Sequence, residues 1–471
     1  MIRYLFGLLF PLLLAIPVSA QQDRFPPGSM AEHIACRSDP TQTYTLYLPT
    51  SFTTDRKWPA LLVFDPRGRA TFAAEIFRAA AEKYGWIIIS SNDTRSDGPM
   101  EPNIKAVSAL WPEVHLRYPT DPDRIYAAGF SGGGIVAWLL GQRTGLLAGI
   151  INSGGRLPEE IPTEKIAFVH YGTTGVRDFN YQPMHAIDAL LEKKGVPHRL
   201  IVFDGSHQWL TKEMALPAVG WLELQAMKRG LRAKDQAIIA ERYGADMQWA
   251  STAESEGNLL EALRRYENVA ATFDGLREIS EPGEKAAALR SNKEVSRERR
   301  EEQSWEDYET RQTMNVFRTI KSLDDPDNPV ALQRVVHDLH LDELLKRREA
   351  KGLQGEAAQR VLESIYVQTS FYIMRDAFAQ KNYSKALMVL TIASRIYPDR
   401  GFVWYNIAAA NARLKHKGEA LDALDRAVDS GFHDAGAAQA DDDLASLREE
   451  PRFQQAMTKM KSLQSSDPAP R

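Results

Sequence analysis

The sequence predicts an α/β fold, with a mostly parallel sheet covered by helices on both faces, followed by an all-α helical repeat domain. Short apolar runs such as 59–64 and 86–90 alternate with helical segments over the first half of the chain. Strands of this kind are buried on both faces, which requires a layer of helices on either side of the sheet. Beyond residue 235 the runs stop, and alanine-rich helical patterns take over.

Composition sets the size and class of the protein. Its 471 residues are enough for two or three domains with their own cores. The 58 Lys and Arg residues nearly balance the 62 Asp and Glu residues, which argues against a nucleic-acid partner, since such proteins are normally basic. Cys36 is the single cysteine, so no intramolecular disulfide can form, and we expect a packed thiol.

Residues 1–20 have the pattern of a secretory signal peptide. Arg3 supplies the positive start, 4–18 is an apolar run, and 18–20 (Val-Ser-Ala) fits the small-x-small cleavage pattern. We therefore expect export, to a periplasm or out of the cell. An uncleaved membrane anchor is the alternative, but the run is short of the roughly 20 residues that a spanning helix needs. No other stretch is long and apolar enough, so we expect no stable membrane insertion after cleavage.

The predicted α/β domain covers residues 21–235. Segment 43–49 alternates polar and apolar residues, as a half-buried strand does, and later strands are continuous apolar runs. The predicted strands are 43–49, 59–64, 86–90, 124–129, 146–152, 166–170 and 198–203. The predicted helices are 71–84, 103–118, 134–140, 181–194 and 211–227. A chain that ends near residue 235 is expected to fold alone.

The helical part is predicted to have two regions, a connector over 236–365 and repeats over 366–471. Segment 283–311 is dense in charge and carries opposite-sign pairs four residues apart, such as Arg290 and Glu294. Pairs at this spacing are neighbours on a helix surface. The segment is therefore predicted to be a solvated helix or a connector and not a binding site.

Small and apolar residues recur 34 residues apart near the C-terminus. Ala386, Leu390, Ala393 and Pro398 return as Ala420, Leu424, Ala427 and Phe432. The pattern resembles the tetratricopeptide repeat, a packed helix pair with small residues where the helices cross, although Phe432 departs from the family's terminal proline. An ordinary helical bundle is the alternative. The resemblance implies a domain that binds a protein partner, shapes access to a site or mediates oligomers.

The motif Gly129-Phe130-Ser131-Gly132-Gly133 carries the clearest chemistry. It lies between a predicted strand and a predicted helix, the setting in which G-x-S-x-G forms a sharp turn that exposes the serine. The flanking glycines let the turn close without a Cβ clash. We expect Ser131 to be a nucleophile.

On this motif and its setting, the chain from about Thr43 to Gly230 resembles the α/β-hydrolase family, and within it secreted esterases related to polyhydroxybutyrate depolymerase and dienelactone hydrolase. The resemblance implies the chain order nucleophile, acid, histidine. It assigns the acid to Asp178, which follows the strand at 166–170, and the histidine to His207, which follows the last strand. Two alternatives stand for the acid: Asp178 only caps the next helix, or Asp188 takes the role.

The same resemblance implies two donors for the oxyanion. The backbone N–H of Gly132 follows the nucleophile directly, and the second donor is expected in the loop after strand 59–64. Pro66 has no N–H, so Arg67 is the expected donor and Gly68 the next. Arg67, Arg69 and Arg177 lie in loops near the site, where they either favour an acidic substrate or are solvated loop charges.

These residues predict an exported serine hydrolase that cleaves a small-molecule carboxylic ester through an acyl-enzyme on Ser131, with no cofactor. No motif for a metal or a phosphate-binding loop occurs in the sequence. Two alternatives stand: a serine peptidase of the same fold, and a non-catalytic exported protein that interacts through its helical repeats. His170 and His198 are expected to be structural. Trp209 either lines a pocket or packs against the sheet.

Overall fold

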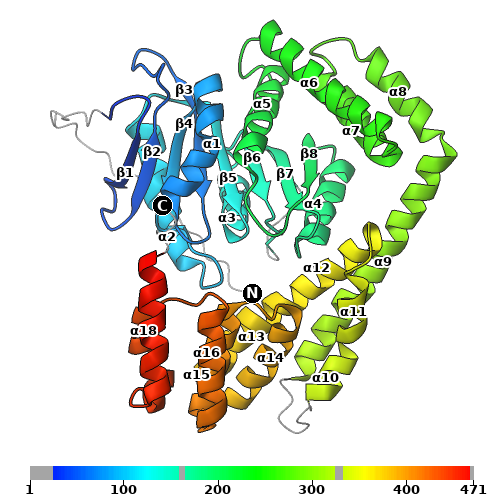
Figure 1. Ribbon diagram of the computed structural model, residues 1–471. Coiled ribbons are helices and arrows are strands. Elements are labelled where there is room, and N and C mark those ends of the chain that lie inside the picture. Colours follow the sequence, from blue (N-terminus) through cyan, green and yellow to red (C-terminus); the bar gives the residue numbers. More distant parts are fainter. Residues whose placement is uncertain (1–24, 159–164, 324–331, 467–471) are drawn as a thin grey trace, which may run out of the picture.

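Eight strands form a single sheet in the computed structural model, which describes residues 25–158, 165–323 and 332–466 (Figure 1). The strands are β1 Met30–Ala35, β2 Thr43–Tyr47, β3 Trp58–Phe64, β4 Ile87–Ser91, β5 Thr120–Phe130, β6 Gly149–Ser153, β7 Val169–Gly175 and β8 His198–Phe203. Their order is β1-β2-β4-β3-β5-β6-β7-β8, with β2 antiparallel to both its neighbours and the remaining pairs parallel. The predicted fold class is confirmed. The predicted signal peptide, 1–20, lies outside the described residues.

Helices cover both faces of this sheet. They are α1 Ala70–Tyr84, α2 Glu101–Leu116, α3 Gly132–Thr144, α4 Tyr181–Lys193 and α5 Lys212–Lys228. One apolar cluster joins the sheet to α2, α3 and α4, and a second joins the opposite face to α1 and α5. Every residue of β3 and β4 is buried as a result, which explains their continuous apolar sequences.

Two strands differ most from the prediction. β1 was not predicted, because this edge strand buries only Ile34 and shows no apolar run. β7 begins at Val169 and continues to Gly175, well past the predicted end at His170. The extension is rich in glycine and threonine, yet it is buried and pairs with β8 throughout. Pairing with neighbours, and not the apolar pattern, determines where this strand ends.

His170 is buried in β7, as a structural histidine would be, at 3% exposure. Burial, and then the nearby His198, lowers its pKa to about 3. Below the unfolded pKa of about 6.5, the imidazole takes up a proton in the unfolded state but not in the folded state. The free energy of unfolding is therefore highest above about pH 6.5 and decreases as the pH falls below that value. Between pH 7 and pH 5.5 we expect His170 to cost about 1 kcal/mol of unfolding free energy.

Urea unfolding at the two pH values tests this expectation. The His170→Leu protein should lose about 1 kcal/mol less than the wild type over this interval. His337→Leu, at an exposed position of helix α10 (Leu332–Asp338), is the matched control. Equal losses in wild type and His170→Leu would contradict a neutral buried imidazole.

The first two helices beyond residue 235 pack against the α/β part. Helices α6 (Gln236–Ser255) and α7 (Leu259–Phe273) form a hairpin whose Ile239, Val269 and Phe273 cover Leu224 and Met227 of α5. An ion pair also joins α6 to the sheet. Asp246 of α6 pairs with the buried Arg199 of β8 at 2.7 Å and with Arg242 at 3.1 Å.

The predicted boundary at 235 therefore lies inside a packed unit. A chain of residues 21–235 would expose Leu224 and Met227, which α6 and α7 cover, and would lose the ion pair between Arg199 and Asp246. We expect that chain to be insoluble or to unfold at lower urea than a chain of residues 21–279, which retains α6 and α7. Equal urea midpoints for the two chains would support the predicted domain boundary at 235.

A long helix then connects this unit to the C-terminal helices. α8 (Ser280–Arg290) leads into α9 (Lys293–Ser322), which runs down one side of the molecule (Figure 1). The charged segment 283–311 is thus helical and connecting, as predicted, but it is not solvated throughout. Glu309 is buried, and Glu302 pairs with Arg264 of α7.

The C-terminal part consists of helices only. These are α10 Leu332–Asp338, α11 Leu341–Arg347, α12 Leu353–Val367, the π-helical turn η1 Gln368–Tyr372, α13 Ile373–Ala379, α14 Tyr383–Ile396, α15 Gly401–Arg413, α16 Lys417–Asp429, α17 Ala435–Ala440, the 3₁₀ turn η2 Asp442–Leu447 and α18 Pro451–Ser466. Ala386 and Ala420, which are 34 residues apart, are fully buried at equivalent places in α14 and α16. Among the described residues, none of the helices combines the length and the apolar character that crossing a membrane requires.

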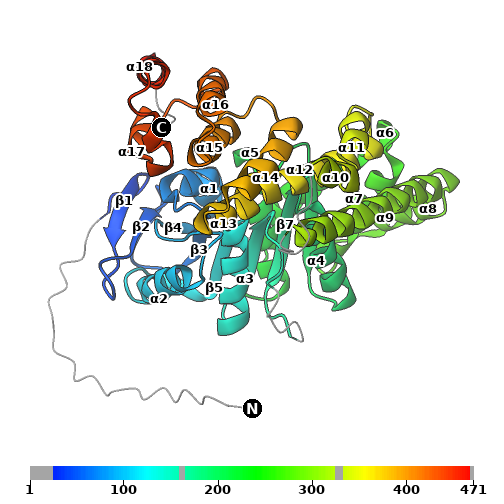
Figure 2. The same ribbon diagram turned by 90° about the horizontal axis from the view of Figure 1, so that it is seen from below.

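These C-terminal helices fold back across one end of the sheet (Figures 1 and 2). Helices α12 and α13 lie beneath the carboxyl ends of the central strands, and the long connection through α9 makes this return possible. In a parallel sheet, ligands bind beyond the carboxyl ends of the strands. The fold thus brings the helical part to the place where a site is expected.

Candidate active site

Ser131 lies on a sharp turn between β5 and α3. Its φ of 51° and ψ of −120° are unusual for a residue other than glycine. Its N–H donates to the carbonyl of Ser153 at 2.9 Å, which holds the turn against β6. A Cβ on Gly129 would lie 2.1 Å from the Gly133 oxygen, and one on Gly133 would lie 1.9 Å from the Phe64 oxygen. The turn therefore requires glycine at both positions, as the sequence predicts.

The three predicted triad residues are in hydrogen-bond contact. His207 Nε2 lies 2.9 Å from Ser131 Oγ, and His207 Nδ1 lies 2.8 Å from Asp178 Oδ1. A carboxylate can only accept, so Nδ1 carries the hydrogen and Nε2 is left to accept the serine proton. Asp178 is fully buried, and its Oδ1 also accepts from the Asn180 N–H at 2.7 Å. The geometry matches a serine, a base and a carboxylate that orients the base.

Aromatic rings and a close-packed glycine hold the imidazole in place. The rings of Phe130 and Phe179 lie 4.6 Å and 4.3 Å from the His207 ring. Gly154 has a φ of 56°, and a Cβ there would lie 2.8 Å from Asp178 Oδ2. Sequence reasoning did not single out Phe179 or Gly154. For Gly154, the one signal in the sequence was its position just after a predicted strand, where site residues often lie.

The structure contradicts the expected role of Arg67. Its N–H donates to Asp65 Oδ1 at 2.9 Å, within its own loop, and so does not point at the serine. Gly68, the next candidate, donates to the Asp65 carbonyl at 3.1 Å. Gly132 remains well placed, because it begins α3 directly after Ser131 and the first amides of a helix lack intrahelical acceptors. Ser96, which sequence reasoning missed, packs against Gly132.

Asp65 organises this loop. Arg69 contacts the carboxylate with two nitrogens, at 2.9 and 3.1 Å, and Trp209 Nε1 donates to it at 2.9 Å. Burial raises the pKa of Asp65, but the hydrogen bonds from Arg69, Trp209 and Arg67 outweigh it, so the pKa is lowered. Trp209 therefore packs against the sheet, anchors a loop beside the site and also lines the cleft there, so both predicted alternatives hold.

The remaining candidates are placed as follows. Asp188 lies near His198, at 3.4 Å, and not near His207, which removes the rival to Asp178. Arg177 pairs with Asp204 at 2.6 Å, and Arg69 pairs with Asp65. Both guanidinium groups are thus neutralised, which favours the interpretation as loop charges.

Cys36 is buried, and burial raises its pKa to about 12, as expected of a packed thiol.

Two clefts meet at Ser131. The larger has a volume of about 740 Å³ and is lined by His207, Phe72 and Phe179, together with residues of α12, η1 and α15. The smaller has a volume of about 510 Å³ and is lined by Gly132 and by polar side chains that include Arg156. The serine thus opens to space on both sides.

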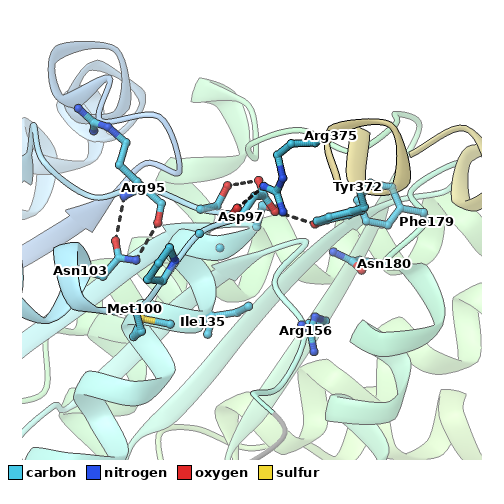
Figure 3. A pocket seen from close by; sticks show the side chains of 15 residues that line it. Arg95, Asp97, Met100, Asn103, Ile135, Arg156, Phe179, Asn180, Tyr372 and Arg375 are labelled. Carbon is cyan, nitrogen blue, oxygen red and sulfur yellow. Dashed lines mark hydrogen bonds between the residues drawn. The ribbon is translucent and has the colours of Figure 1, made fainter. Parts of the chain in front are cut away.

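The helical part closes over these clefts through direct contacts. Tyr372 donates its hydroxyl proton to Asp97 Oδ1 at 2.6 Å, and Arg375 donates to the Asp97 carbonyl. Figure 3 shows both side chains directed at Asp97 across the smaller cleft. Farther along, Arg360 of α12 donates to the carbonyl of Val176, two residues before Asp178, at 2.9 Å. The candidate site therefore lies between the two halves of the chain.

Comparison with known proteins gave structural neighbours only. No family model and no curated protein matches the sequence. An esterase from the archaeon Pyrobaculum calidifontis is similar over 44% of this chain and 87% of its own, with 14% identity and a TM-score of 0.33. The fluorophosphonate-binding serine hydrolase F of Staphylococcus aureus is similar over 42% of this chain and 98% of its own, with 16% identity and a TM-score of 0.34. Esterase B from Lactobacillus Rhamnosis is similar over 44% of this chain and 89% of its own, with 13% identity and a TM-score of 0.36. Identities and TM-scores this low do not allow the activity of these proteins to be assigned to this chain.

Proposed function

We propose that this protein is a serine hydrolase that cleaves a carboxylic ester through an acyl-enzyme on Ser131. The observation that carries the proposal is the unbroken contact from Ser131 Oγ through His207 to the buried Asp178, on a positive-φ turn between two clefts. A serine hydroxyl becomes a useful nucleophile only when a base removes its proton, and His207 is in position to do so. No cofactor enters this chemistry.

The proposed reaction has two halves. His207 takes the Ser131 proton as Oγ attacks the ester carbonyl, and the Gly132 N–H stabilises the resulting oxyanion. The C–O bond to the alcohol then breaks, and His207 returns the proton to the leaving alkoxide. A water molecule, deprotonated by His207, attacks the acyl-enzyme in the same way and releases the acid and free Ser131. Asp178 stabilises the imidazolium in both halves.

The related proposals concern the rest of the chain. We propose export through residues 1–20, and a tetratricopeptide-like character for the helix pairs α13–α14 and α15–α16, on the sequence patterns described above. Fully buried Ala393 and Ala427 at equivalent positions support the second proposal. The esterase subfamily suggested by the sequence remains part of the proposal.

An ester and an amide that carry the same acyl group test whether the protein is an esterase or a peptidase. We expect hydrolysis of 4-nitrophenyl acetate that depends on Ser131, and no detectable release of 4-nitroaniline from 4-nitroacetanilide or from peptide anilides. Cleavage of a peptide anilide at a rate equal to that of the ester would favour the peptidase alternative. Absence of both activities would favour the non-catalytic alternative.

A further inference from the structure

The larger cleft at Ser131 has walls from both halves of the chain. Phe72 and Phe179 belong to the α/β part, whereas Tyr366, Phe371 and Phe402 belong to α12, η1 and α15. Residues almost three hundred positions apart thus face the same space. The helical part does not merely cover the site but supplies aromatic side chains to its wall.

Aromatic rings in this cleft are exposed to solvent. Phe72, Phe371 and Phe402 are 50%, 37% and 49% exposed. The described part of the chain contains one other phenylalanine among its exposed large apolar side chains, Phe317 on α9, which does not line the cleft. Exposed apolar groups that gather at one concave place mark a binding site, whereas single ones do not.

The helical wall is held in a defined position. Phe371 lies in the π-helical turn η1, a distortion often found at functional sites. The next residue, Tyr372, bonds to Asp97, and the Tyr372 ring packs edge-on against Phe371 at 5.1 Å. Asp97 itself has a φ of 62°, which is unusual for a residue other than glycine. The ring of Phe371 is therefore presented by a fixed wall.

The position of His207 determines which part of an ester enters this cleft. The base must lie within hydrogen-bond reach of the leaving alcohol oxygen in order to protonate it. His207 lines the larger cleft and not the smaller, whereas Gly132, the expected oxyanion donor, lines the smaller cleft and not the larger. The alcohol side of the ester thus belongs in the larger cleft, and the acyl side beside Gly132.

Charged groups at the larger cleft do not change this conclusion. Arg69 is paired with Asp65 and lies over the Phe72 ring at 4.7 Å, so its charge is compensated and its plane extends the aromatic surface. Lys212 pairs with Glu75 at 3.3 Å. Arg67 and Asp97 also line this cleft: Asp97 accepts a hydrogen bond from Tyr372, and Arg67 is exposed, so its side chain can extend into water. The aromatic surface that remains suits an uncharged ring.

We propose that the substrate is an ester of an aromatic alcohol, whose ring lies between Phe72 and the helical residues Phe371 and Phe402. This inference rests on the proposed function. It assigns the helical part a direct role in substrate selection, beyond any partner that the repeats bind.

Two isomeric esters test the orientation. Benzyl acetate carries its ring on the alcohol side, and methyl phenylacetate carries it on the acyl side, with the same atoms in total. We expect kcat/KM of the full-length protein, measured by acid release, to be about tenfold higher or more for benzyl acetate. Equal values, or a preference for methyl phenylacetate, would overturn the proposal.

Substitutions in the wall test the residues. The ratio of kcat/KM for benzyl acetate to that for ethyl acetate should fall about tenfold in Phe371→Ala and in Phe402→Ala, mainly through KM. Phe317→Ala, which removes an exposed ring outside the cleft, should leave the ratio at the wild-type value. An unchanged ratio in both cleft variants would overturn the proposal.

The proposed function can fail separately. Suppose that ethyl acetate is hydrolysed in a Ser131-dependent manner, but that benzyl acetate is preferred neither to methyl phenylacetate nor to ethyl acetate. Then only this inference is wrong. If no ester is hydrolysed and a fluorophosphonate probe does not label the protein, the proposed function fails, and this inference fails with it.

Discussion

Replacement of Ser131 by alanine is expected to abolish labelling by a fluorophosphonate probe and to lower ester hydrolysis by at least about 10⁴-fold. The reason is that Oγ is the proposed nucleophile and lies 2.9 Å from His207 Nε2. The fold should not change. The turn is held by the Ser131 backbone N–H, which alanine retains, so the free energy of unfolding should stay within about 0.5 kcal/mol of the wild type.

The control for this experiment is Ser255→Ala, which removes an exposed serine at the end of α6. It should retain both labelling and hydrolysis. Labelling retained in Ser131→Ala would show that another residue is the nucleophile. Loss of hydrolysis together with a large fall in the urea midpoint would mean that the turn had collapsed, which the backbone contacts argue against.

Replacement of Arg360 by methionine is expected to have the largest effect on stability. Arg360 and Glu309 form an ion pair at 2.7 Å, with side-chain exposures of 3% and 5%. Removal of one partner leaves a charge buried without its counter-ion, which costs about 3–5 kcal/mol. The urea midpoint should fall accordingly. Ester hydrolysis by the protein that remains folded should also fall, because Arg360 donates to Val176 in the loop that carries Asp178.

Two further variants separate these effects. In Arg360→Met/Glu309→Met no lone charge remains, so most of the lost stability should return while the bond to Val176 stays absent. Arg290→Met breaks an exposed pair with Glu267 and should change the unfolding free energy by less than about 1 kcal/mol. If the double variant were as unstable as Arg360→Met, packing against Tyr181, and not the ion pair, would be the source of the loss.

The sequence was informative at the turn that carries Ser131. A turn that places Ser131 at a positive φ leaves no room for a Cβ at Gly129 or Gly133, so the motif itself carries the conformation. Asp178 and His207 could be chosen by the chain order that the resemblance to α/β-hydrolases implies. The fold class followed from apolar runs whose burial on both faces the structure confirms.

Other features were decided only by contacts between distant parts of the chain. The sequence alone could not indicate that Asp246 of α6 neutralises Arg199 of β8, or that Phe371 and Phe402 line a cleft beside Ser131. Each depends on how separate elements pack, and a short sequence pattern records the conformation of its own segment but not its distant neighbours. The local sequence thus determined the proposed reacting groups of this protein, whereas the return of the helical half across the sheet determined the shape of the space around them.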